Sequence, residues 1–155
     1  MTKEEKYKDL IAQVKALSEA ESDTIAVMAN VAAILHETFR FWWTGFYRVD
    51  GQELVLGPFQ GPLACTRIPF GRGVCGTAWK ERCTITVGDV EQFPGHIACS
   101  SQSKSEIVVP IFRNDEIVAE LDIDSEKLNT FDETDKNFLE KIAQIIGEKF
   151  QNSHL

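Results

Sequence analysis

Residues 106–124 read EIVVPIFRNDEIVAELDID, and their pattern decides the class of fold. From residue 119 onward, apolar and acidic residues alternate, which is the period of a β-strand with one apolar and one acidic face. Residues 106–112 and 116–124 therefore predict two adjacent strands joined near Asn114-Asp115. The apolar face comprises Ala119, Leu121 and Ile123, and the acidic face comprises Glu120, Asp122 and Asp124.

Two registers of this hairpin are open, and they place Glu106 on opposite faces of the sheet. A two-residue turn at Asn114-Asp115 pairs residue 106 with residue 123 and leaves Glu106 on the apolar face. A three-residue loop pairs residue 106 with residue 124 and adds Glu106 to the acidic face. Because a proton shared between carboxyl groups needs both groups on one face, we predict that Glu106 lies opposite Asp124.

Two environments are open for the acidic face. An antiparallel sheet commonly exposes its polar face to solvent, and the carboxylates then have no special role. Alternatively, loops cover this face, and the crowded carboxylates pair with a ligand ammonium or hold a proton at a raised pKa. The alternation alone does not choose between these environments.

The chain before this hairpin predicts two helices and a second hairpin. Apolar residues recur at helical spacing over residues 3–19, and Ser22 or Asp23 can cap the helix that follows. The aromatic segment 41–49 is extended, and a turn at Asp50-Gly51 leads into a strand over residues 53–56. The expected buried stripe of the second helix comprises Ile25, Met28, Ala29, Ala32 and Leu35.

The remaining segments complete an α+β pattern. Residues 57–76 are rich in glycine and proline and open a short helix toward Trp79, and a short strand follows over residues 84–87. Residues 88–104 form a long polar loop, of the kind that is usually functional in a small domain. A last helix begins at Phe131-Asp132-Glu133.

The order of these elements lacks regular strand–helix–strand alternation, so we expect an α+β domain with a mainly antiparallel sheet. Helices should cover one face of the sheet. The two long loops should cover the other face, where a small ligand can bind. We expect residues 1–155 to form one domain, with residues 1–20 as an N-terminal helix.

Composition narrows the classes of partner. The chain has 16 Lys and Arg against 24 Asp and Glu, for a formal net charge of −8, and 43% of its residues are hydrophobic. A negative field of this size repels phosphate backbones and anionic lipid, so we expect neither nucleic-acid nor membrane binding. The charged N-terminus and the lack of a long apolar run predict a cytoplasmic protein.

Four cysteines in such a chain do not suggest a disulfide scaffold; they are core thiols, metal ligands or redox groups. The chain has no C-x-x-C pair, and His96 with Cys99 is the only compact pair of metal ligands, which disfavours structural zinc. Cys83 stands at the start of a predicted strand, where we expect a buried, inert thiol whose replacement changes catalysis little.

The other cysteines, Cys65, Cys75 and Cys99, lie in loops or at the ends of elements. A nucleophilic cysteine must be a partly exposed thiolate near positive charge or a helix N-terminus. Cys75 meets this condition locally because it stands where a helix begins. Cys99 has His96 three residues before it and a serine-rich flank after it, so spacing alone does not choose between them.

Several of these segments, in this order, resemble the free methionine-(R)-sulfoxide reductases, which are single-domain enzymes of the GAF fold. The resemblance covers roughly residues 20–150, and the combined motifs are far more specific than any one of them. The segments are Trp43 with GFY at 45–47, GPFQGP at 57–62, ACTRIP at 64–69, GRGVCG at 71–76, FPGHIAC at 93–99, SEIVVP at 105–110 and LDIDS at 121–125. The visible departure is Ser100-Ser101-Gln102, where the family often has Asp after the cysteine.

The resemblance implies roles for the three loop cysteines. Cys99 would be the nucleophile and Cys65 its resolving partner, with Cys75 an alternative resolver or a supporting residue. Thioredoxin would reduce the resulting disulfide, and no metal or organic cofactor is implied. A homodimer is left open.

The resemblance also implies a pocket formed by Trp43, Tyr47, Glu106, Asp122 and Asp124. Glu106 or Asp124 would give a proton to the sulfoxide oxygen, Asp122 would pair with the substrate ammonium, and Trp43 would pack against the methyl end. Backbone amides of residues 97–103 would receive the substrate carboxylate. Two other functions stay open, a GAF sensor that binds a small ligand without turnover and a thiol peroxidase or redox sensor.

Overall fold

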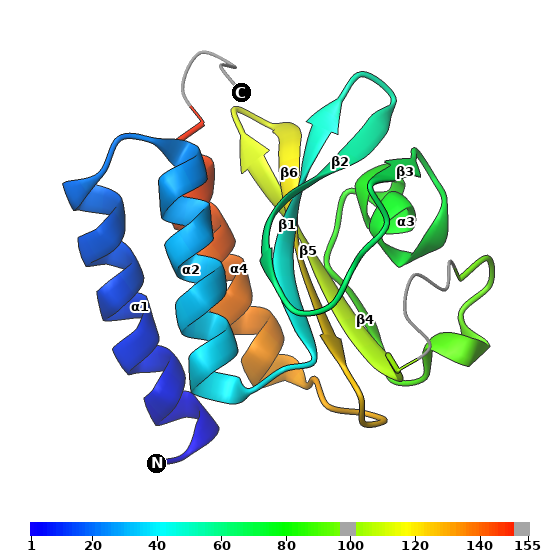
Figure 1. The fold of residues 1–155 in the computed structure, drawn as a ribbon, viewed down its shortest axis with the longest axis horizontal. Helices are drawn as coiled ribbons and strands as arrows, with labels where there is room; N and C mark the ends of the chain where they lie inside the picture. Colours follow the sequence, from blue (N-terminus) through cyan, green and yellow to red (C-terminus); the bar gives the residue numbers. More distant parts are fainter. Residues whose placement is uncertain (97–101, 151–155) are drawn as a thin grey trace.

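A computed structural model of the chain describes residues 1–96 and 102–150 (Figure 1). In this part of the chain, six strands form one sheet in the order β3-β2-β1-β6-β5-β4, with every neighbouring pair antiparallel. The helices are α1 (Lys3–Ala20), α2 (Thr24–Phe39), α3 (Gly73–Glu81) and α4 (Glu133–Gly147), with a short 3₁₀ turn at Val90–Gln92. The strands are β1 (Trp43–Asp50), β2 (Glu53–Gln60), β3 (Arg67–Pro69), β4 (Ile85–Val87), β5 (Ser105–Arg113) and β6 (Glu116–Ser125). The predicted α+β class with an antiparallel sheet is confirmed.

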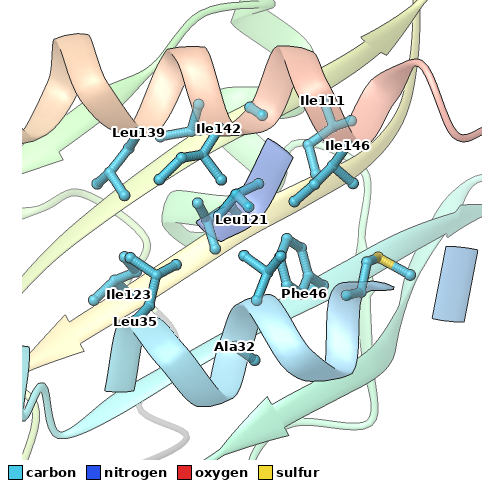
Figure 2. Packing of buried hydrophobic residues seen from close by; sticks show 14 of the residues in the cluster. Ala32, Leu35, Phe46, Ile111, Leu121, Ile123, Leu139, Ile142 and Ile146 are labelled. Carbon is cyan, nitrogen blue, oxygen red and sulfur yellow. The ribbon is translucent and has the colours of Figure 1, made fainter. Parts of the chain in front are cut away.

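Helices α1, α2 and α4 form a layer on one side of the sheet (Figure 1). The apolar face of β6 packs into this layer, so that strands and helices share one core (Figure 2). Removing such apolar surface from water contributes about 25 cal/mol per Å², which makes this core the main source of stability. Its fully buried members include Leu35, Phe46, Ile111, Leu121, Ile123, Leu139, Ile142 and Ile146.

Local signals explain where the helices begin and how they are held. Asp23 caps α2 by accepting a hydrogen bond from the backbone N–H of Ala26 at 2.9 Å. At α4, Asp132 and Asp135 form a reciprocal capping box. The hydroxyl of Tyr7 in α1 donates a 2.6 Å hydrogen bond to Asp135, which ties α1 to the start of α4.

The apolar stripe expected for α2 was wrong in part. Ile25 is 49% exposed and Ala29 is exposed, whereas Val27 and Val31 are buried. Because most residues of this helix are apolar, more than one of its faces could pack inward. The sheet against which it packs therefore decides which face is buried.

The β5–β6 hairpin combines parts of both registers considered above. Its turn has two residues, because Arg113 pairs with Glu116. Asn114 and Asp115 both have positive φ, 52° and 67°, as a type I′ turn requires. The turn is therefore the shorter of the two alternatives.

A β-bulge then changes the register by one residue. Ile111 pairs with Ala119, which leaves one extra residue on β6 between the turn and this pair. From there to the far end the ladder is regular, and Glu106 lies opposite Asp124. The predicted pairing is confirmed, although a bulge produces it rather than a three-residue loop.

Three further expectations needed correction. The first hairpin turns at Gly51-Gln52, because Asp50 pairs with Glu53, and β2 continues to Gln60. Strand β3 was not expected at all. Helix α3 does not join the other helices: it packs on the opposite face of the sheet, in a second apolar cluster with Tyr47 and Val108 (Figure 1). None of the described helices is long and apolar enough to cross a bilayer.

Candidate functional site

The acidic face of β6 is covered, not exposed to solvent. Glu120 has no exposed surface, Asp122 is 5% exposed and Glu106 of β5 is 6% exposed, while Asp124 is half-buried. Helix α3, the aromatic residues of β1 and the loops around them cover these carboxyl groups. Of the two environments considered above, loop coverage is confirmed.

A cavity of about 60 Å³ opens above these carboxyl groups. It brings together the five pocket residues that the resemblance implies and Cys75. Arg72 at the start of α3, which the sequence did not single out, also lines the cavity, and so does Ser103, from the loop assigned to the substrate carboxylate. The lining comprises Trp42, Trp43, Tyr47, Leu63, Ala64, Ile68, Arg72, Gly73, Val74, Cys75, His96, Ser103, Glu106, Asp122 and Asp124.

Burial and mutual repulsion favour protonated carboxyl groups on this cavity floor. Burial, followed by the charges of Asp122 and Asp124, raises the pKa of Glu106 well above its usual value. Burial and the charge of Asp122 also raise the pKa of Asp124. Burial raises the pKa of Asp122 as well, but the hydrogen bond from Glu106 opposes that rise. These effects favour the neutral form of Glu106, and the hydrogen bond from Glu106 favours the ionised form of Asp122.

Ser103 acts on this cluster from the loop side. Its hydroxyl donates a 3.0 Å hydrogen bond to Oδ1 of Asp124, which favours the ionised form of that carboxyl group. In the serine-rich flank after Cys99, this hydroxyl thus binds a carboxylate of the protein itself. No spacing rule identifies this contact, because the two residues are far apart in the chain.

Glu120 is a buried carboxyl group that the sequence placed on the acidic face without a role. Neither of its carboxylate oxygens has a hydrogen-bond partner. It lies opposite Tyr47 on one side and Pro110 on the other, and proline has no N–H to donate. Burial and the charge of Asp122 raise the pKa of Glu120 well above its usual value, which favours the neutral acid.

Trp43 and Tyr47 form the aromatic wall of the cavity and hold the loop above it. The Trp43 indole Nε1–H donates to the carbonyl of Pro62 at 3.1 Å, and the Tyr47 hydroxyl donates to the carbonyl of Cys65 at 2.8 Å. Their rings lie 6.0 Å apart, centre to centre. Gly45 stands between them on β1, and a Cβ there would lie 2.6 Å from the Trp43 ring. The glycine therefore allows this ring to lie against the strand.

Cys75 lies in the first turn of α3, as the sequence predicted, but it is only 4% exposed. Burial, followed by the charges of Asp122 and Glu106, raises its thiol pKa well above the usual value. A nucleophile must be a thiolate, so these neighbours oppose nucleophilic attack by Cys75. The local reading of Cys75 as a candidate nucleophile is therefore not supported.

The other cysteines differ in exposure and bonding. Cys65 is half-buried and disulfide-bonded, while Cys75 and Cys83 are free thiols. Cys83 is exposed, so the expectation of a buried thiol there was wrong. Helix α3 ends at Glu81 and is capped by Arg82 in the left-handed conformation, and the chain passes Cys83 at the surface before β4 begins. Cys99 lies outside the described residues.

Comparison with known proteins agrees with this architecture. A model of the GAF domain matches residues 21–150. "GAF domain-containing protein A" of Dictyostelium discoideum is 56% identical over 94% of this chain and 92% of its own length. The "Free methionine-R-sulfoxide reductase" of Escherichia coli is 44% identical over 94% of this chain and 89% of its own length.

A solved structure is similar in sequence and in shape. It is the free methionine-R-sulfoxide reductase of Neisseria meningitidis, in complex with its substrate, and it is 52% identical with a TM-score of 0.95. The match covers 97% of this chain and 92% of that chain. The resemblance seen in the motifs is confirmed. The chain belongs to the GAF domain family and, within it, to the family of the free methionine-R-sulfoxide reductases.

Proposed function

We propose that this chain reduces free methionine-R-sulfoxide to methionine, with Cys99 as the attacking thiol. The observation that carries the proposal is the pair Glu106 and Asp124, which lie opposite each other on the floor of a covered cavity. Reduction of a sulfoxide requires a proton donor, because the oxygen leaves the substrate sulfur only if it is protonated. A carboxyl group at this place in the cavity can supply that proton.

In the first step, the Cys99 thiolate takes the oxygen from the substrate sulfur while a carboxyl group of the Glu106–Asp124 pair supplies a proton. The S–O bond of the substrate breaks and a new S–O bond forms on Cys99. Methionine is the reduced product, and the cysteine is oxidised by two electrons to a sulfenic acid. Glu106 is favoured as the donor, because burial and the neighbouring carboxylates raise its pKa and its hydrogen bond to Asp122 favours the protonated form.

In the second step, the Cys65 thiol condenses with the sulfenic acid; water leaves and a disulfide forms. We favour Cys65 over Cys75 as the resolving thiol. The support is that Cys65 is disulfide-bonded whereas Cys75 and Cys83 are free thiols. Thioredoxin would then reduce the disulfide by dithiol exchange, which places the reaction in a reducing compartment, the cytoplasm.

Preference for the free amino acid follows from the charges around the cavity. A free substrate carries an ammonium and a carboxylate, and both need partners when they leave water. Asp122, whose ionised form is favoured by the hydrogen bond from Glu106, would pair with the ammonium. Residues 97–101 of the loop that we assigned to the carboxylate lie outside the described part, and Arg72 lines the cavity as a second candidate for it. Trp43 would pack against the methyl group.

The test is consumption of NADPH in an assay coupled through thioredoxin and thioredoxin reductase. We expect turnover with free methionine-R-sulfoxide and little with the S epimer or with a peptide that contains methionine sulfoxide. A sensor would show binding without NADPH consumption. A thiol peroxidase would show faster turnover with hydrogen peroxide, and either result would refute the proposal.

A further inference from the structure

The cavity floor holds three side chains of metal-binding type that the chemistry above does not use together. Cys75 Sγ and one carboxylate oxygen each of Glu106 and Asp122 all lie within 4.8 Å of one another. They come from α3, β5 and β6, so three separate elements of the fold hold them in place. Each of the three residues is at most 6% exposed.

No basic side chain in the described part of the chain forms an ion pair with this group. The ion pairs found between described residues join Lys3 to α4, Lys8 to Glu4 and Arg67 to the first hairpin, and none reaches the cavity floor. Oδ1 of Asp122 is buried and has no hydrogen-bond partner. A buried oxygen of this kind, within a group of ligands, lacks a donor or a cation.

The set of atoms indicates which cations suit the group. Zn²⁺ binds thiolate sulfur at about 2.3 Å and carboxylate oxygen at about 2.0–2.2 Å, with tetrahedral geometry. Such a geometry places ligand atoms roughly 3.3–3.7 Å apart, so small side-chain rotations would bring the three atoms onto one ion. A thiolate ligand favours Zn²⁺ and Cd²⁺ over Mg²⁺ and Ca²⁺, which prefer oxygen ligands only.

We propose that Cys75, Glu106 and Asp122 bind one soft divalent cation, such as Zn²⁺, with a fourth coordination position open to the cavity. Binding exchanges the ion for the protons of the Cys75 thiol and the Glu106 carboxyl group, so the charge of the buried group hardly changes. The ion would use Asp122, the residue assigned above to the substrate ammonium. The ion and the substrate ammonium would then compete for Asp122. This competition rests on the proposed function, but the metal site itself does not.

The test uses Cd²⁺ as the probe, because a cadmium–thiolate bond gives an ultraviolet charge-transfer band. Two full-length proteins with one thiol each are compared, which makes the result independent of disulfide pairing and of activity. The first carries Cys65→Ser, Cys83→Ser and Cys99→Ser and retains Cys75. The second carries Cys65→Ser, Cys75→Ser and Cys99→Ser and retains the exposed Cys83.

We expect the protein that retains Cys75 to give a saturable band at one Cd²⁺ per chain, with an affinity at least about tenfold higher than that of the other protein. Adding Asp122→Asn or Glu106→Gln should weaken binding by about tenfold or more, whereas the exposed control Asp115→Asn should not. Circular dichroism confirms that each variant is folded. Equal affinity in the two single-thiol proteins would overturn the proposal, and so would unchanged affinity in both the Asp122→Asn and the Glu106→Gln variants.

Discussion

Replacement of Gly45 by alanine tests whether the position of Trp43 shapes the cavity. A Cβ at residue 45 would lie 2.6 Å from the Trp43 ring and 2.4 Å from Cβ of Phe59. Ordinary contacts between carbon atoms are about 3.5–4.0 Å, so one or both side chains must move by about 1 Å. Phe59 is poorly able to yield, because its Cα would also lie only 3.0 Å from the new methyl group.

The expected cost has a stability part and a catalytic part. Overpacking of this kind destabilises by about 1–3 kcal/mol, which for a chain of this size lowers Tm by roughly 2–12 °C. A ring displaced by about 1 Å also misplaces the substrate, and we expect kcat/KM to fall by on the order of 100-fold. Thermal unfolding and the thioredoxin-coupled assay measure the two parts separately.

Gly51→Ala is the matched control, because Gly51 lies in the β1–β2 turn and does not line the cavity. Its φ of 64° strains an alanine, but a Cβ there meets no atom within 4 Å. The control should lose about 1 kcal/mol of stability and keep its activity. If Gly45→Ala lowers Tm but keeps the wild-type kcat/KM, the inferred link between Gly45, Trp43 and the cavity is wrong.

Three further predictions concern the carboxyl groups and the thiols. The raised pKa of Glu106 means that its contribution to stability is present at low pH and is lost as pH rises through the pKa of the folded state. In urea titrations, Glu106→Gln should therefore flatten the decline of the unfolding free energy toward alkaline pH, and an unchanged slope would contradict the raised pKa. Cys65→Ser should release one methionine per chain without reductant yet lose thioredoxin-supported turnover, and sustained turnover would remove Cys65 from the cycle. In the reduced protein, iodoacetamide should label exposed Cys83 before buried Cys75, and peptide mass mapping of the reverse order would contradict the burial of Cys75. Cys83→Ala should change kcat/KM less than about twofold.

The β5–β6 hairpin shows which structural features the sequence can predict and which it cannot. Alternation in residues 119–124 predicted the two faces of β6 correctly, because successive side chains of a strand point to opposite faces of the sheet. The pairing of Glu106 with Asp124 was predicted correctly from the requirement that a shared proton needs both carboxyl groups on one face. The bulge that produces this pairing has no signal in the sequence. It depends on the packing of the whole hairpin, which local propensity does not contain.

The environment of single side chains was harder to predict. Residues 71–76 predicted a helix start at Cys75, but only the folded chain shows that buried carboxyl groups surround this thiol. Cys83 was expected to be buried because cysteine usually is, yet the end of α3 leaves it at the surface. Arg72 lines the cavity and the Ser103 hydroxyl contacts Asp124 only because the fold brings the start of α3, β5 and β6 together, which no spacing pattern in the sequence indicated.

The central claim is that Cys99 attacks the sulfoxide, and methionine release in a single turnover tests it most directly. Fully reduced protein is mixed with excess free methionine-R-sulfoxide without thioredoxin, and the methionine formed per chain is counted. The wild type and the control Cys83→Ser should each release about one methionine per chain, and Cys99→Ser should release none. Release of about one methionine per chain by folded Cys99→Ser would contradict the account.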